Sequence, residues 1–315
     1  MRRFVCALAL FVCAAPLYAA DAIPFNLLLA TKGDKSAYFL PTIHQSNQAM
    51  QQRLAQTVRC MPEIDAIVFE VDIDEAMKKF NVTGYSVAEN KKLGQRLPAG
   101  LLAPLDDLAD KVLPPSAPRK GASAANRMGM HPAHFLAMLN GNVNNRILRE
   151  HGINLAGSAF EAMLHGYAGA KKLEELHLEA VDTVAAAHVA IPPQQLSAQA
   201  AYLLRLADDK KMQDDVARVY ADTYALFERG DWTQEDVQGL NAAMRATQPD
   251  AYVANAVLKR TRDMMASFEA LPPRAKPVLV AVGLGHFGKT DGIEAVLAQG
   301  GYTLRRHAVS CRRAP

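Results

Sequence analysis

Three side chains able to bind a metal follow short apolar stretches near the two ends of this 315-residue sequence. His44 lies four residues beyond Tyr-Phe-Leu, Glu70 directly follows Ala-Ile-Val-Phe, and His286 lies on a glycine-rich turn after Val-Leu-Val-Ala-Val. Each stretch predicts a buried strand, and open sheets with helical connections carry their sites beyond the carboxyl ends of strands. Two imidazoles and a carboxylate suit zinc or a similar divalent ion with open coordination positions. The sequence therefore predicts a metal site made of His44, Glu70 and His286.

Glu70 is the most informative of the three residues. A single histidine at a strand end is more often a hydrogen-bonded structural residue, but a carboxylate inside an apolar strand costs several kcal/mol unless it is paired. Glu70 therefore requires an arginine, another cation or a metal. The period of two along a strand places Asp72 on the same face, which predicts a supporting role for Asp72.

The turn that carries His286 also matches two nucleotide-binding patterns. Both GxGxxG and GxxxxGK[ST] begin at Gly283. Each pattern requires further strands downstream, yet only residues 291–315 follow Thr290. Asp291 and Glu294 form a capping box, which starts the next helix too late for Gly283 to cradle a phosphate. We therefore expect no nucleotide, and Gly283 serves instead to support the histidine turn.

The elements that must position these residues lie at the two ends of the chain. Strand patterns occupy residues 26–40 as a hairpin, 66–72, 277–283 and 302–309, while apolar residues from 83 to 271 recur at helical spacing. The two sets of strands are too few to form separate sheets. We expect a mixed α/β fold, with one central mixed sheet from segments 24–75 and 275–312 and a mainly helical insertion over 83–271. The alternative is a separate helical domain.

The first residues have the order of a secretory signal peptide. Arg2 and Arg3 precede an apolar stretch, and a small-residue site ends at Ala19. We expect residues 1–19 to be removed and residues 20–315 to form a single exported domain, in a bacterial periplasm or secreted. Only Cys60 and Cys311 then remain, and in an oxidising compartment they either form a disulfide, which we expect, or lie apart as buried thiols.

Charge and hydropathy exclude several kinds of partner. The formal net charge of +3 falls to about +1 once Arg2 and Arg3 are removed, which is too little to attract nucleic acid over the whole surface. No segment after the signal peptide is apolar enough for a stable membrane span.

These residues resemble the TraB/GumN family, which is related to the Tiki metalloproteases and to the ChaN/erythromycin-esterase group. The resemblance is carried at the ends of the chain by residues 38–44, 68–72, 282–286 and Gly301-Tyr302. It is looser in the middle, at Gly157 through Leu164, Leu178-Glu179, Glu228 through Asp231, and Arg260 through Met264. Three residues depart from the family pattern, namely Pro41, Thr261 and Lys289.

The resemblance implies a metal-dependent hydrolase, and by similarity to the Tiki branch a peptidase. Its cofactor would be a divalent transition metal such as manganese, cobalt or zinc, and its substrate a peptide or a small molecule. Glu70 would be a ligand or the general base. Arg260 would hold a substrate carboxylate or pair with Glu70 or Asp72. The alternative is a non-catalytic periplasmic protein that uses the same pocket to bind a ligand, haem or a metal.

Overall fold

The computed structural model describes residues 24–72, 74–76, 96–113, 131–153, 159–184, 191–246 and 253–311. The expected signal peptide, residues 1–19, and the expected start of the helical insertion at residue 83 lie outside the described residues.

Strands from both ends of the chain form one six-stranded mixed sheet, in the order β4-β3-β5-β2-β1-β6. Strands β2, β5, β3 and β4 are parallel to one another, and β1 is antiparallel to both β2 and β6. The expected single mixed sheet is therefore confirmed. The strands are β1 (Asn26–Lys32), β2 (Lys35–Thr42), β3 (Ala66–Val71), β4 (Glu174–Glu179), β5 (Val278–Gly283) and β6 (Thr303–Ala308).

The central parallel strands are apolar because both of their faces are covered. All of Val278 to Val282 in β5 and all of Ala66 to Phe69 in β3 are buried, as expected for a parallel sheet between two helical layers. At the other end of the sheet, Gly33 turns the β1–β2 hairpin with a φ of 55°, in the left-handed region that glycine adopts without steric cost.

Strand β4 lies within the mainly helical segment 83–271, where the sequence pattern did not indicate a strand. It pairs in parallel with β3 along the edge of the sheet, with Phe69 opposite His177. Its sequence, Glu-Glu-Leu-His-Leu-Glu, is mostly charged or polar, which is common in an edge strand that water reaches on one side. The other described elements between residues 96 and 270 are helical, as expected.

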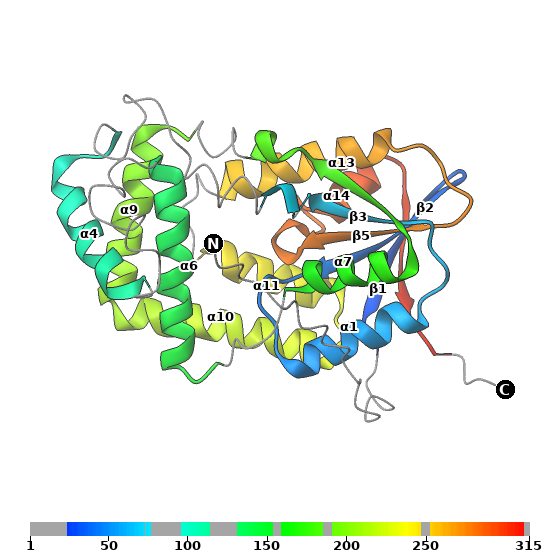
Figure 1. The fold of residues 1–315 in the computed structure, drawn as a ribbon, viewed down its shortest axis with the longest axis horizontal. Helices are drawn as coiled ribbons and strands as arrows, with labels where there is room; N and C mark the ends of the chain where they lie inside the picture. The colour runs from blue at the N-terminus through cyan, green and yellow to red at the C-terminus, as the bar shows by residue number, and fades with distance from the viewer. Residues whose placement is uncertain are drawn as a thin grey trace, which may run out of the picture.

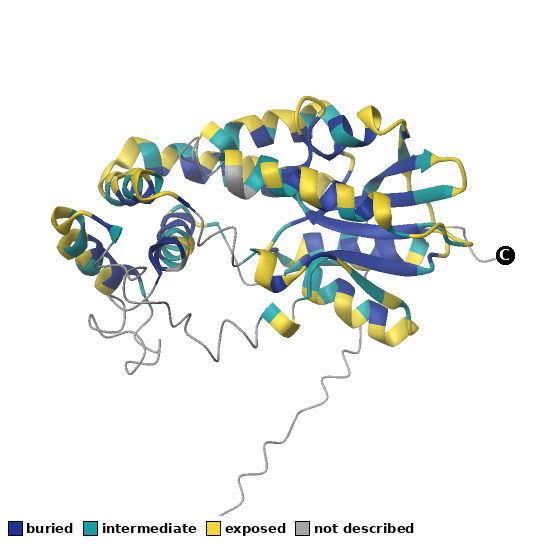
Figure 2. Cartoon of the chain, turned by 90° about the horizontal axis from the view of Figure 1, so that it is seen from above, coloured by how far each residue is buried: buried dark blue, intermediate teal, exposed yellow. Residues whose placement is uncertain are grey.

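Helices cover both faces of the sheet (Figure 1). Helices α1 (Gln48–Cys60) and α7 (Phe160–Lys171) lie on one face, and α13 (Arg260–Ala270) and α14 (Ile293–Gln299) lie on the other. Figure 2 shows the strands buried between these layers, while the outer sides of the helices are exposed. The sheet core is therefore closed on both faces and leaves the strand ends as places for a site.

A second apolar core lies away from the sheet. It is formed by α4 (Ala99–Val112), α6 (Pro132–Glu150) and α9 (Pro193–Asp208). The long helix α10 (Lys210–Arg229) contacts both this bundle and α1, and is followed by α11 (Gln234–Ala246) (Figure 1). No helix among the described residues is long and apolar enough to cross a membrane.

Two further expectations can be compared with the structure. Cys60 and Cys311 form the expected disulfide, with Cα atoms 4.6 Å apart. The expected capping box is wrong, because the N-cap of α14 is Gly292 and the Asp291 carboxylate accepts hydrogen bonds from Arg245 at 2.6 and 2.7 Å. Only glycine fits as this cap, since a Cβ at Gly292 would lie 2.3 Å from the backbone nitrogen of Gly288.

Candidate functional site

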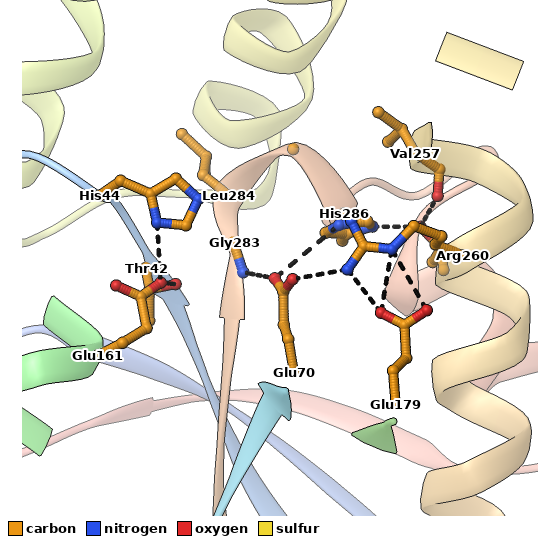
Figure 3. A network of polar contacts seen from close by, with 12 residues as sticks. Thr42, His44, Glu70, Glu161, Glu179, Val257, Arg260, Gly283, Leu284 and His286 are labelled. Atoms are coloured by element: carbon orange, nitrogen blue, oxygen red, sulfur yellow. Dashed lines mark hydrogen bonds and ion pairs between the residues drawn. The ribbon is translucent and has the colours of Figure 1, made fainter. Parts of the chain in front are cut away.

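Four parallel strands deliver polar groups to one edge of the sheet. Thr42 ends β2, Glu70 is the penultimate residue of β3, Glu179 ends β4, and Gly283 ends β5. The registers align these ends, since Thr42 is opposite Gly283 and Val71 is opposite Glu179. The carboxyl edge therefore gathers residues that are up to 241 positions apart in the sequence, between Thr42 and Gly283 (Figure 3).

Glu70 lies at the centre of this edge. One carboxylate oxygen, Oε1, accepts a hydrogen bond from the backbone N–H of Gly283 at 2.5 Å, and Oε2 accepts one from Arg260 at 3.1 Å. A Cβ at Gly283 would lie only 3.0 Å from Oε1. A side chain at position 283 would crowd the Glu70 carboxylate, so the close approach favours glycine there. Gly283, expected as a supporting residue, thus holds Glu70 through its backbone N–H.

Arg260 joins Glu70 to a second buried glutamate. Its guanidinium donates to Glu179 from Nε at 3.0 Å and from Nη2 at 2.5 Å, in addition to its bond to Glu70. Arg260 is the first residue of α13 and directly follows a π-helical turn, η3 (Val253–Lys259). Turns of this kind are frequent at functional sites. Of the two roles expected for Arg260, the structure shows the ion pair with Glu70.

Glu70 remains ionised although it is buried. Burial alone raises the pKa of a carboxyl group, but the His286 and Arg260 side chains and the Gly283 N–H together hold the pKa of Glu70 below its usual value. A carboxylate that favours its charged form is thus present beside His286.

His286 is buried and its ring orientation is fixed. The Thr261 hydroxyl donates to the backbone carbonyl of Val257 at 2.8 Å, so its oxygen accepts the Nδ1 proton of His286, also at 2.8 Å. We assign this tautomer from the hydrogen-bond network. The unprotonated Nε2 then faces Oε1 of Glu70 across 3.9 Å, which is too far for a hydrogen bond. Burial lowers the pKa of His286, and the charge of Glu70 opposes this shift.

The turn that presents His286 is held from outside by α11. It is a short 3-10 segment, η4 (Leu284–His286). Asn241, which is 2% exposed, donates to the backbone carbonyls of Leu284 at 2.9 Å and Phe287 at 2.5 Å. These carbonyls lie on either side of His286, so Asn241 fixes the position of the turn rather than contacting the ring.

His44 lies on the other side of Glu70 and faces solvent. Its side chain is 85% exposed, and its Nδ1 lies 3.7 Å from Oε1 of Glu161 (Figure 3). Glu161 is near the start of α7, only 14% exposed, and its Oε1 accepts a hydrogen bond from Thr42 at 2.5 Å. The other oxygen, Oε2, is buried and has no hydrogen-bond partner among the described residues. Burial raises the pKa of Glu161, and the charge of Glu70 adds to this shift.

Asp72 is directed elsewhere. Its carboxylate accepts a hydrogen bond from the backbone N–H of Glu75 at 2.8 Å, and it lines a separate hollow together with His165 and His177. Among the described side chains, Arg260 donates a hydrogen bond to Glu70, and the supporting role expected of Asp72 stays a prediction.

The candidate ligands form two neighbouring pairs. Glu70 is paired with His286, and Glu161 is paired with His44. Within the described part of the chain, no three His, Cys, Asp or Glu side chains are already arranged as a metal-binding group. The expected sharing of one ion by His44, Glu70 and His286 therefore stays a prediction.

Two site residues, Glu161 and Glu179, were not among the residues that the sequence singled out as chemical. Glu161 is placed by the first turn of a helix, and Glu179 by the strand that the sequence pattern did not reveal. The available signal was indirect, since both glutamates lie inside the looser segments of family resemblance.

The fold and the carboxyl edge of the sheet together define the class of this protein. This is an α/β protein whose parallel strand ends hold a buried cluster of carboxylates, imidazole and guanidinium. The sequence profile of the TraB/PrgY/gumN family matches residues 26–306, and the chain belongs to this family. No curated protein and no solved structure gives a significant match.

Proposed function

We propose that this protein is an exported, metal-dependent hydrolase that acts on a peptide or a small molecule at the carboxyl edge of its sheet. The observation that carries the proposal is the Oε2 atom of Glu161, a buried carboxylate oxygen without a partner among the described residues. A buried carboxylate oxygen needs a proton or a cation, and here it lies beside an exposed imidazole, that of His44.

The donor atoms at this edge fit a divalent transition metal. Glu161 offers an unused oxygen, and His286 offers an unprotonated Nε2 directed at another acceptor, Oε1 of Glu70. His44 is exposed and free of tight packing, so it can complete the set. Imidazole nitrogen and carboxylate oxygen are the ligands of manganese, cobalt and zinc sites. When bound, such an ion polarises a carbonyl group and lowers the pKa of water toward neutrality.

The two glutamates support different chemical roles. The Arg260 guanidinium and the Gly283 N–H favour the ionised form of Glu70, so it provides negative charge at this edge. Glu161, whose pKa is raised by burial, has one oxygen without a partner among the described residues, and this oxygen would be a metal ligand.

Export is supported by the covalent structure. The Cys60–Cys311 disulfide joins the end of α1 to the segment after β6. Disulfides of this structural kind form and persist in oxidising compartments such as the bacterial periplasm.

A non-catalytic binding protein is the second candidate. It is favoured by the Arg260–Glu70 ion pair, since an arginine already neutralises the central carboxylate and reduces its need for a metal. In such a protein the edge would hold a ligand, haem or a metal without turnover.

Hydrolysis of a peptide mixture, followed by mass spectrometry, tests the proposal. We expect cleavage that stops after chelation, returns when manganese, cobalt or zinc is added, and is lost in His286→Ala. The surface variant His151→Ala is the matched control and should cleave normally, because His151 pairs with Asp214 on α10. Metal binding without any cleavage would favour the second candidate instead.

A further inference from the structure

An apolar hollow of about 330 Å³ lies between helices α1 and α7. A hollow of this size is at the lower end of the range for small-molecule sites. The phenol of Tyr167 is already satisfied, since its hydroxyl donates to the backbone carbonyl of Val58 at 3.1 Å. Six of the lining side chains are mainly apolar, and two are cations. The apolar ones are Leu54, Ala55, Val58, Met163, Leu164 and Tyr167, and the cations are Arg59 and Lys171.

The two cations lie at the same end of the hollow. Arg59 is in the last turn of α1, and Lys171 is the last residue of α7. Both are exposed, and neither makes a hydrogen bond or an ion pair within the described ranges. A cation in the last turn of a helix is favoured by the helix dipole. That preference explains each charge alone, but it does not explain why two unpaired cations border an apolar hollow that no carboxylate lines.

We propose that this hollow binds an amphipathic anion with a single alkyl chain, such as a medium-chain fatty carboxylate. The apolar chain would lie along Leu54, Val58 and Met163, and the carboxylate would be held by Arg59 and Lys171. Removal of the chain from water provides the non-directional part of the affinity, and the two cations provide the selectivity for a negative head group.

The walls of the hollow argue against an extended peptide as its occupant. Both walls are helices, and apart from their terminal turns the backbone N–H and C=O groups are hydrogen-bonded within each helix. A peptide main chain would therefore find no strand edge to pair with. The hollow is also distinct from the carboxyl edge of the sheet, because its lining residues include none of the glutamates or histidines gathered there.

Calorimetric titration of the full chain with decanoate tests the proposal, with decanol and decyltrimethylammonium as probes that share the alkyl chain. We expect saturable binding of one decanoate per chain, about tenfold or more weaker binding of decanol, and no binding of the cation. Decanoate binding should also weaken at high salt, because exposed charges are screened. Equal affinity for decanoate and decanol, or no saturation with decanoate, would overturn the proposal.

Variants locate the binding within the fold. Replacing both cations, as Arg59→Gln with Lys171→Gln, should reduce decanoate affinity to that of decanol, and Ala55→Trp should fill the hollow and abolish binding. Ala55 is exposed on α1, so its replacement leaves the core intact. Arg149→Gln, which removes an exposed cation in the last turn of α6, is the matched control and should bind as the wild type does. Wild-type affinity in the double variant or in Ala55→Trp would place the ligand elsewhere and contradict the proposal.

Discussion

At the scale of single residues, two buried glutamates at the carboxyl edge have opposite environments. Both oxygens of Glu179 receive hydrogen bonds from Arg260, and Glu179 is only 4% exposed. Glu161 is nearly as buried, but one of its oxygens is without a partner among the described residues. Breaking a buried ion pair leaves an uncompensated charge, whereas a buried oxygen without a partner already costs free energy in the folded state.

We therefore expect opposite results from the same substitution at these two positions. Since the pKa of Glu161 is raised in the folded state, its ionisation reduces stability as pH rises toward neutrality. Glu161→Gln should leave the free energy of unfolding at pH 7 unchanged or higher, because it removes that charge. Glu179→Gln should lower the free energy of unfolding by about 3–5 kcal/mol, because the buried Arg260 guanidinium then loses one of its two carboxylate partners. Urea denaturation of metal-free protein measures both, and a large loss in Glu161→Gln would contradict the account.

A second prediction concerns the glycine against which Glu70 packs. In Gly283→Ala the added methyl group would lie 3.0 Å from Oε1 of Glu70, so the carboxylate must move and its bond to the Gly283 N–H must lengthen. We expect a loss of about 1–3 kcal/mol in unfolding free energy, together with weaker binding of divalent metal. Gly285→Ala is the control, since nothing lies within 4 Å of its added Cβ. Equal behaviour of the two variants would show that the contact with Glu70 has no importance.

The residue types and strand-end spacing were sufficient to predict that Glu70 and His286 lie together. They were not sufficient for Glu161, whose place depends on how α7 docks against the end of β2, through the backbone hydrogen bond from Phe160 to Ile43 at 3.2 Å. Nor did the period of two predict the direction of Asp72, because β3 ends at Val71 and the alternation ends with it. Long-range docking and strand ends are both decided by tertiary contacts that a local pattern does not contain.

At the scale of elements, helix α11 determines where the His286 turn lies. In Asn241→Ala the carbonyls of Leu284 and Phe287 would lose their donor in a buried place, which costs about 1–3 kcal/mol. We expect that destabilisation together with a changed NMR signal of the His286 ring, because the turn becomes free to move. Gln238→Ala, on the same helix, removes only an exposed bond to Thr290 and should change stability by less than about 0.5 kcal/mol. An unchanged His286 signal in Asn241→Ala would show that α11 does not position the turn.

Elements with a strong apolar pattern were predicted well, and the one with a weak pattern was missed. The hairpin β1–β2 and the central strands β3 and β5 are apolar and buried, so their sequence reports their structure directly. Strand β4 has only Leu176 and Leu178 as apolar residues and lies within a helical region of the sequence. Residues 174–179 form a strand because they pair with the edge of β3. That pairing depends on the assembled sheet and not on the local sequence.

At the scale of the whole molecule, the disulfide joins positions that are 251 residues apart. Removing both cysteines, as Cys60→Ser with Cys311→Ser, should lower the free energy of unfolding by about 5 kcal/mol at most, because the unfolded chain regains the entropy of a long loop. Urea denaturation with and without reductant measures this effect. Reductant should destabilise the wild type and leave the double variant unchanged; a wild type insensitive to reductant would show that the bond contributes nothing.

The central claim is that the carboxyl edge of the sheet binds a divalent metal, and metal stoichiometry tests it most directly. Purified protein should be loaded separately with manganese, cobalt and zinc, dialysed, and analysed for bound metal per chain. We expect one bound ion per chain for at least one of these metals in the wild type and in the control His151→Ala. We expect its loss in His286→Ala and in Glu161→Gln, which each remove one proposed ligand while leaving the sheet intact. A wild type that retains none of the three metals, or variants that retain as much as the wild type, would contradict the account.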